Sequence, residues 1–65
     1  MKTLKKNRRM VGLSQHELAK RTGIRVGRIA FAETGRRTLT ATEIEKIQAA
    51  IARRAAEVVA AVANA

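Results

Sequence analysis

The 65-residue sequence contains no cysteine, no proline and no tryptophan, and Phe31 is its one aromatic residue. Without cysteine the chain forms no disulfide, and no zinc-binding pattern is present, so a domain this small must be held together by helix packing or by a partner. Most of its residues are alanine, leucine, isoleucine, lysine, arginine or glutamate, which are acceptable or good in helices, and no proline interrupts them. We therefore expect a single domain with an all-α fold.

Aspartate is also absent, and the single histidine, His16, has neither a second histidine nor a cysteine to accompany it. A metal site or an acid–base pair needs such neighbours, and glutamates on separate helices do not make a paired-carboxylate site. We interpret His16 as a surface residue. The expectation is a protein that is not an enzyme and that needs no metal and no cofactor.

The sequence has no long apolar segment. No run reaches the roughly 18–20 residues that span a bilayer, and the start, MKTLKK, lacks the apolar stretch of a signal peptide. We expect a cytoplasmic protein with no membrane partner and no small-molecule ligand. A basic helix lying on a membrane surface is a weak alternative, because the positive charge and the apolar tail occupy different segments.

The positive charge is confined to the first part of the chain. The whole sequence holds 14 Lys and Arg against five acids, a formal net charge of +9. Residues 1–39 hold eleven of these bases and two acids, whereas residues 40–65 hold three of each. This distribution indicates a basic segment that faces a polyanion, joined to a neutral segment whose role is helix packing.

Capping residues predict the first two helices. The first should run over residues 4–11, with Thr3 as its N-cap and Gly12 as its end. Ser14, followed three residues later by Glu17, has the form of a capping box and begins the second helix. That helix should end at Thr22.

The third helix is predicted over residues 26–33, with Gly35 as its terminator. Thr40 and Glu43 form a second capping box, after which neither glycine nor proline occurs. Apolar residues recur there at three-to-four spacing, so residues 40–63 form one long helix, or two with a bend near residues 52–54. The expected fold therefore has four to five helices.

Residues 15–34 meet the steric requirements of two short helices joined by a tight turn. Ala19 is small where the second helix of the pair crosses the first, and Gly23 supplies the turn. Apolar side chains fill the wedge between the two helices. These side chains are Leu18, Ile24 and Ile29.

In these segments the sequence resembles the helix-turn-helix proteins typified by the lambda repressor and Cro. The resemblance covers about residues 4–51 and rests on Gly12-Leu13-Ser14-Gln15, Glu17-Leu18-Ala19, Gly23-Ile24, Ile29 and Glu33-Thr34-Gly35-Arg36. It implies a DNA-binding domain at residues 1–51, with its helix-turn-helix motif at 15–34. Residues 52–65 would be a C-terminal helical extension.

The resemblance also implies roles for individual residues. The third helix would present its outer side to the major groove, where the candidates for base contact are Arg25, Val26, Gly27, Arg28 and Phe31. Gln15, Arg36 and Arg37 would contact phosphates, and Arg8 would form an internal ion pair with Glu33. Because no acid lies among Lys5, Lys6 and Arg9, these three are also expected on phosphates.

Several alternatives remain open at these positions. Arginine is the commonest reader of guanine, which favours a base contact for Arg28, whereas Arg25 is equally suited to a base or a phosphate. Val26 either packs on a thymine methyl or is partly buried. Phe31 either faces DNA or turns inward, because the neighbouring position holds only an alanine. Gly27 costs its helix about 1 kcal/mol relative to alanine, which indicates close approach to a partner or mere tolerance.

The apolar stripe of the last predicted helix points to self-association. A helix of some twenty residues spans about 30 Å, which is longer than the three shorter helices can cover. We call these three helices the head. We expect a homodimer whose interface contains Ile47, Ile51, Ala55, Val58 and Val62. The resulting hypothesis is a homodimeric transcriptional repressor of palindromic sites in double-stranded DNA. The alternative is an antitoxin-like protein whose C-terminal helix binds another protein and whose head binds DNA secondarily.

Overall fold

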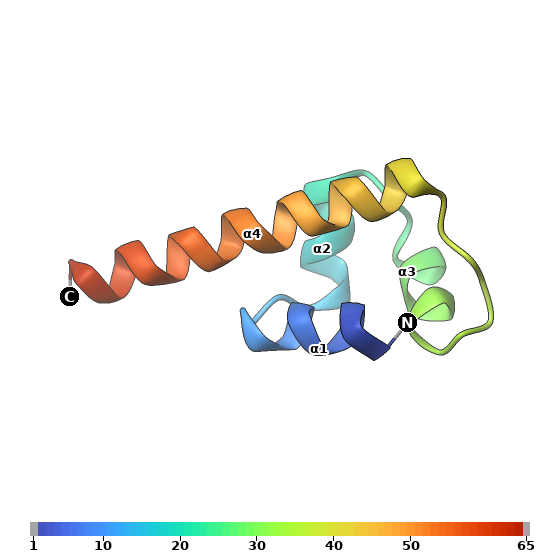
Figure 1. Cartoon of the computed structure of the whole chain (residues 1–65), viewed down its shortest axis with the longest axis horizontal. Coiled ribbons are helices and arrows are strands. Elements are labelled where there is room, and N and C mark those ends of the chain that lie inside the picture. Colours follow the sequence, from blue (N-terminus) through green and yellow to red (C-terminus); the bar gives the residue numbers. More distant parts are fainter. Residues whose placement is uncertain (1, 65) are drawn as a thin grey trace.

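The computed structural model describes residues 2–64, with side chains from Thr3 onward, and this part of the chain contains helices and no strands. The helices are α1 (Lys2–Met10), α2 (Gln15–Thr22), α3 (Val26–Glu33) and α4 (Ala41–Ala63). The predicted all-α fold is confirmed, and the segment after Thr40 is one helix. Figure 1 shows α1 to α3 gathered at one end of α4, while the other end of α4 continues as a free rod.

The predicted boundaries hold at every helix except the first. Ser14 Oγ accepts a hydrogen bond from the Glu17 amide at 3.0 Å, which is one of the two bonds of a capping box. At Thr40 both bonds are present, because the Thr40 amide also donates to the Glu43 carboxylate. The prediction that Thr3 caps α1 is wrong: the helix already includes Lys2, since neither residue opposes a helical conformation strongly enough to delay its start.

The apolar core lies where α4 crosses the three short helices. Leu18 of α2, Ile29 of α3 and Ile47 of α4 are the largest side chains that are completely buried. Around them lie the other buried apolar residues, which are Leu4, Leu13, Ile24, Ala32, Leu39 and Ala50. Each helix therefore contributes to one core. No helix in residues 2–64 is long and apolar enough to cross a membrane.

Polar bonds tie α4 to the head beyond the end of that core. Arg54 Nε donates to the carbonyl oxygen of Val11 at 3.0 Å, in the loop between α1 and α2. Glu57 accepts two hydrogen bonds from Arg21 of α2, at 2.8 and 3.0 Å. The contacts of α4 with the head thus extend past residue 51, the boundary expected from the sequence.

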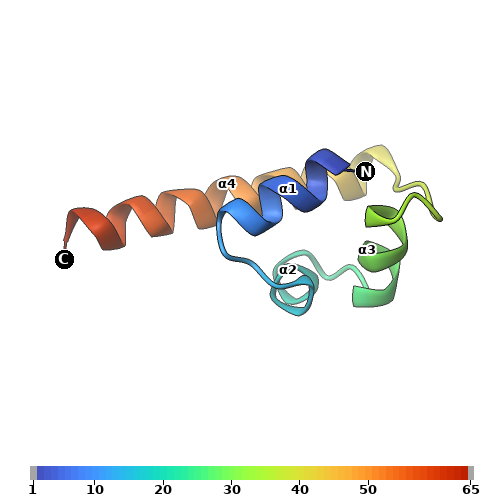
Figure 2. The same ribbon diagram turned by 90° about the horizontal axis from the view of Figure 1, so that it is seen from below.

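The last turns of α4 carry apolar side chains that nothing in the described structure covers. Val59 is 68 % exposed and Val62 is 72 % exposed, and Figure 2 shows this end of α4 reaching beyond the other helices. The expectation that Ile47 belongs to a dimer interface is wrong, because this side chain is only 1 % exposed and fills the core of its own chain. Ile51 is partly buried and packs against the same core.

Candidate nucleic-acid interface

The turn between α2 and α3 is tight because Gly23 adopts a left-handed conformation, with φ of 75°. Its amide donates to the Ala19 carbonyl at 2.8 Å, which closes α2. Thr22 Oγ1 then accepts from the amide of Ile24 at 3.3 Å, and Ile24 enters the core. The chain passes directly into α3, whose N-cap is Arg25 and makes no side-chain capping bond.

One side of α3 is buried and the other is open. Ile29, Ala32 and Glu33 face the interior. The opposite side borders a shallow hollow of about 670 Å³ whose lining residues, which we call the α3 face, are Arg25, Val26, Gly27, Arg28, Phe31 and Arg37. The structure therefore brings together all five residues expected to contact bases and adds Arg37, for which the resemblance implied a phosphate contact.

Phe31 belongs to this open side. Its side chain is 44 % exposed, whereas Ala32 is completely buried. The alternative in which Phe31 turns inward to fill the core is wrong, because Ala32, three residues after Ile29, occupies the position that faces the core. A turn of about 100° per residue then directs Phe31 away from that core.

Arg28 is held by a residue outside α3. Its Nη2 donates to Glu43 Oε1 at 2.8 Å and its Nε donates to Glu43 Oε2, so the pair is bidentate. The Arg28 side chain is 35 % exposed and that of Glu43 is 18 % exposed. Hydrogen bonds from Arg28, and then from the Thr40 amide, lower the pKa of Glu43 to about 2. Arg28 is thus a paired cation at the edge of the α3 face.

A second ion pair lies inside the head. Arg8 donates to the Glu33 carboxylate at 2.7 and 3.0 Å and to the Leu13 carbonyl at 2.7 Å. Gln15 Nε2 also donates to Glu33, at 3.0 Å. Burial of Glu33 opposes ionisation, but the bonds from Arg8 and Gln15 and the positive charge of Lys5 bring its pKa below the ordinary value. This network fixes α3 relative to α1 and to the start of α2.

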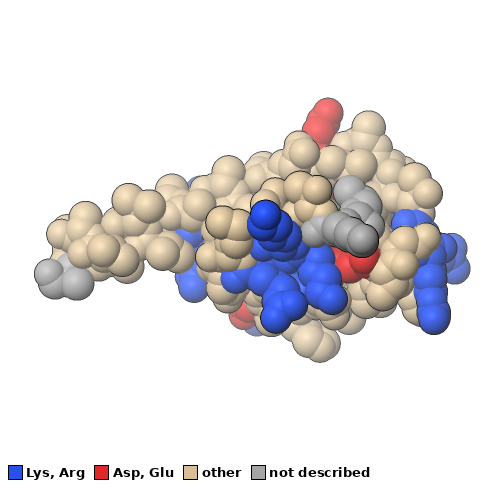
Figure 3. Space-filling view, turned by 60° about the horizontal axis from the view of Figure 1, so that its bottom comes forward, with Lys and Arg blue, Asp and Glu red and all other residues tan. Residues whose placement is uncertain are grey.

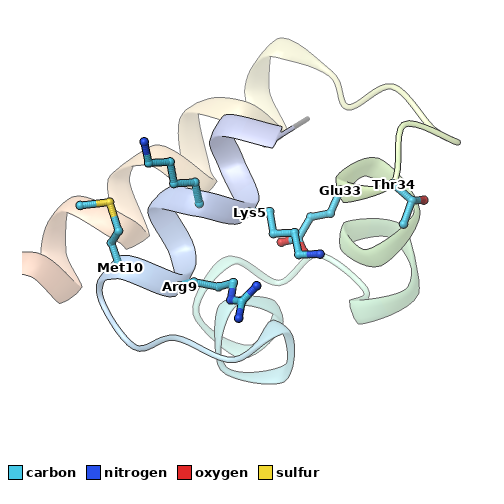
Figure 4. A pocket seen from close by; sticks show the side chains of 6 residues that line it. Lys5, Arg9, Met10, Glu33 and Thr34 are labelled. Carbon is cyan, nitrogen blue, oxygen red and sulfur yellow. The ribbon is translucent and has the colours of Figure 1, made fainter.

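Exposed cations lie on α1 and in the loop after α3. Lys5, Lys6 and Arg9 of α1 line a hollow that also includes Glu33 and Thr34 at the end of α3. Figure 4 shows Lys5 extending from α1 beside Glu33. Arg36 and Arg37 are exposed in the loop after α3. In Figure 3 the Lys and Arg side chains gather on the head, and the outer end of α4 shows none.

Sequence reasoning missed the partner of Arg28 and the residues that clamp α4. It identified Glu43 only as half of a capping box, and it gave Arg21, Arg54 and Glu57 no role. The two residues that each of these bonds joins are separated by between 15 and 43 positions in the sequence. The one signal available beforehand was that Glu43 and Glu57 are two of only five acids among 14 bases, so each had many cations to pair with.

Comparison with known proteins gave one finding. The helix-turn-helix family model matches residues 4–58, which include nearly all of α1, all of α2 and α3, and α4 as far as the end of its contacts with the head. Comparison with curated proteins gave no match, and comparison with solved structures gave none either. The matched region covers well over half of the chain and contains the tight α2–α3 turn and the open side of α3. The chain therefore belongs to the helix-turn-helix family of DNA-binding regulators, of the type of Cro and the lambda repressor.

Proposed function

We propose that the chain is a homodimeric transcriptional repressor that reads a palindromic or near-palindromic operator with α3. The observation that carries this proposal is the α3 face, since the fold buries one side of α3 and leaves the other side open. An α-helix fits the major groove of B-DNA, where each base pair presents a distinct pattern of donors, acceptors and methyl groups. Repression then follows from occupying the site and excluding other proteins from it.

Base contacts are assigned to five residues of the α3 face, whose side chains differ from one another in chemistry. Arg25 and Arg28 supply N–H donors for guanine O6 and N7. Val26 and Phe31 supply apolar surface for thymine methyl groups. Apart from its chain neighbours and the backbone of its own helix, no described atom lies within 4 Å of where a Cβ of Gly27 would lie, so nothing in the described part of the chain requires a glycine there. We assign Gly27 to close approach of the helix backbone to a base pair.

Phosphate contacts are assigned to side chains around α3. Among these side chains are five exposed cations, Lys5, Lys6, Arg9, Arg36 and Arg37. Gln15, the first residue of α2, uses one N–H of its amide for Glu33 and has a second N–H for a phosphate oxygen. The N-terminus of α2 adds the partial positive charge of a helix end. These contacts fix the register of the protein on the duplex and bring most of the affinity.

The dimer contact is assigned to the free part of α4. Val58 and Val62 lie four residues apart on one side of the helix, with Ala55 one turn earlier. This segment carries few charges, so a second copy is not repelled. A two-fold axis through paired α4 tails would place two α3 helices on successive major grooves.

The exposure of Val59 and Val62 also favours a second function, that of an antitoxin-like protein whose α4 tail occupies a groove on another protein. Sedimentation of the purified chain distinguishes the two. A dimer at micromolar concentration supports the repressor. A helical monomer supports the partner-binding protein.

The first test concerns salt. Because several cations neutralise phosphates, log affinity should fall linearly against log salt, with a slope of about −0.9 per phosphate contact. Arg36→Ala should reduce the magnitude of the slope by about 0.9 per protomer and weaken binding to all sequences alike. Arg53→Ala, which removes an exposed arginine of α4, should leave the slope unchanged. A flat plot for the unmodified protein would remove DNA as its partner.

The second test concerns Gly27. Replacement by alanine should stabilise α3 by about 0.5–1 kcal/mol, since a glycine inside a helix costs this much and the added methyl group meets no protein atom. The same methyl group should weaken binding to the preferred duplex by about 1–3 kcal/mol, as overpacking does elsewhere. Thermal unfolding and duplex titration measure the two effects. A stabilised variant with full affinity would show that no base pair approaches Gly27.

A further inference from the structure

The pair of Arg28 and Glu43 sets Arg28 apart from the other cations of the α3 face. Arg25 and Arg37 are exposed and have no ion-pair partner among residues 3–64. Arg28 is less exposed and is bound through two hydrogen bonds by a carboxylate from α4. A residue outside α3 therefore controls how one side chain of the α3 face is presented.

The bonds to Glu43 use one edge of the guanidinium and leave another. Arginine has five N–H donors in a planar fork, and here Glu43 takes the Nε donor and one donor of Nη2. Both donors of Nη1 and the second donor of Nη2 are left. Two parallel N–H groups are what a bidentate contact to guanine O6 and N7 requires. Arg28 can thus keep Glu43 and still bind a guanine through its outer edge.

Glu43 is the fixed member of the pair. Its carboxylate accepts a bond from the Thr40 amide at 2.9 Å, and its own amide donates to Thr40 Oγ at 3.1 Å. These bonds anchor it in the first turn of α4, whose next turns enter the core at Ile47. The guanidinium of Arg28 is therefore oriented before DNA arrives, which reduces the side-chain ordering that binding would otherwise require.

The pair also removes Arg28 from the general attraction between protein and DNA. A carboxylate in direct contact cancels most of the field of the guanidinium at the distance of a phosphate, so the pair acts as a neutral unit. Exposed cations such as Arg36 attract any duplex. Arg28 in its pair gains from DNA only where a base edge meets its remaining donors.

We infer that Glu43 is a positioning residue that sets the DNA specificity of this protein, by directing the outer edge of Arg28 at one base pair and by masking its charge from phosphates. This inference rests on the proposed function, in which the α3 face enters the major groove. It goes beyond that function by assigning specificity to a residue of α4.

Glu43→Gln tests the inference because glutamine retains the capping box but not the charge. The probes are a duplex selected by the unmodified protein from a random pool and the same duplex with its base order scrambled. The variant should bind the scrambled duplex several-fold more tightly, and its log–log salt slope should steepen by about 0.9 per protomer, because Arg28 becomes available to a phosphate. The ratio of the two affinities should fall by about tenfold, within the range of one bidentate base contact.

Three further variants separate positioning from a structural role. Glu57→Gln breaks the matching pair with Arg21, and it should leave the affinity ratio and the salt slope unchanged. Thr40→Ala removes the hydroxyl that caps α4, but the backbone amide of residue 40 still donates to the Glu43 carboxylate, so the variant should lower the melting temperature and keep the ratio. When Arg28→Ala is already present, adding Glu43→Gln should change the ratio by less than about twofold.

Each result decides the matter. An unchanged ratio in Glu43→Gln, or an equal loss of affinity for both probes, would overturn the inference and leave the proposed function intact. An unmodified protein that binds both probes equally would overturn the proposed function itself, before any variant is considered.

Discussion

Arg8→Ala is expected to lower the free energy of unfolding by about 3–5 kcal/mol, a large part of the stability of a domain of this size. The Arg8 side chain is 9 % exposed and that of Glu33 is 2 % exposed, and the substitution leaves the Glu33 carboxylate buried with Gln15 as its remaining side-chain donor. Breaking a buried ion pair by removing one partner costs about 3–5 kcal/mol. A 65-residue domain has a total stability of only about 3–10 kcal/mol. Urea unfolding followed by circular dichroism measures the loss.

Two companion variants show whether the lost stability comes from breaking the ion pair or from any substitution in this part of α1. Arg9→Ala removes the exposed neighbour on the same helix and should change stability by less than about 0.5 kcal/mol. Arg8→Met combined with Glu33→Leu replaces the pair by apolar groups and should recover most of the lost stability. A loss below about 1 kcal/mol in Arg8→Ala would show that the network does not hold α1 and α3 together.

Val58→Glu combined with Val62→Glu is expected to convert the proposed dimer into a folded monomer. Both side chains lie past Glu57, the last residue of α4 that bonds to the head, so the core should be unaffected. Four carboxylates would face one another across the two-fold axis. Affinity for a full operator should fall by about 100-fold or more, because two linked half-sites exceed a single one by factors of this order. Weak binding to any duplex should persist.

The matched control places the same charges on the opposite side of the same helix. Ala56 and Ala60 are exposed and have the same four-residue spacing, about half a turn away from Val58 and Val62. Ala56→Glu combined with Ala60→Glu should remain dimeric by sedimentation and bind the full site. A Val58, Val62 variant that stays dimeric and still prefers the full site would place the dimer contact on the head.

Local signals in the sequence predicted much of the fold. Thr40 with Glu43 marked the start of α4, and Gly23 marked the turn between α2 and α3, because capping bonds and a positive φ depend on residues close in sequence. The start of α1 could not be predicted in the same way. Thr3 is an acceptable cap and also an acceptable helical residue, so its type alone did not distinguish the two.

Features that depend on distant packing were not predictable. The apolar spacing of α4 runs without a break from Ile47 to Val62, yet the head buries Ile47 and leaves Val62 exposed. Periodicity reports which side of a helix is apolar, but not how far along it a neighbouring unit extends. The bond between Arg28 and Glu43 has the same origin, since it depends on where the start of α4 lies relative to α3.

In the proposed function the open side of α3 reads DNA sequence as part of a two-fold dimer. The decisive experiment is selection of bound duplexes from a random DNA pool by the purified protein. The expected result is an enriched inverted repeat whose half-site centres lie one helical turn apart, about 10–10.5 base pairs, because paired α3 helices must meet successive major grooves. A pool that shows no enriched sequence after repeated selection would contradict sequence reading by α3.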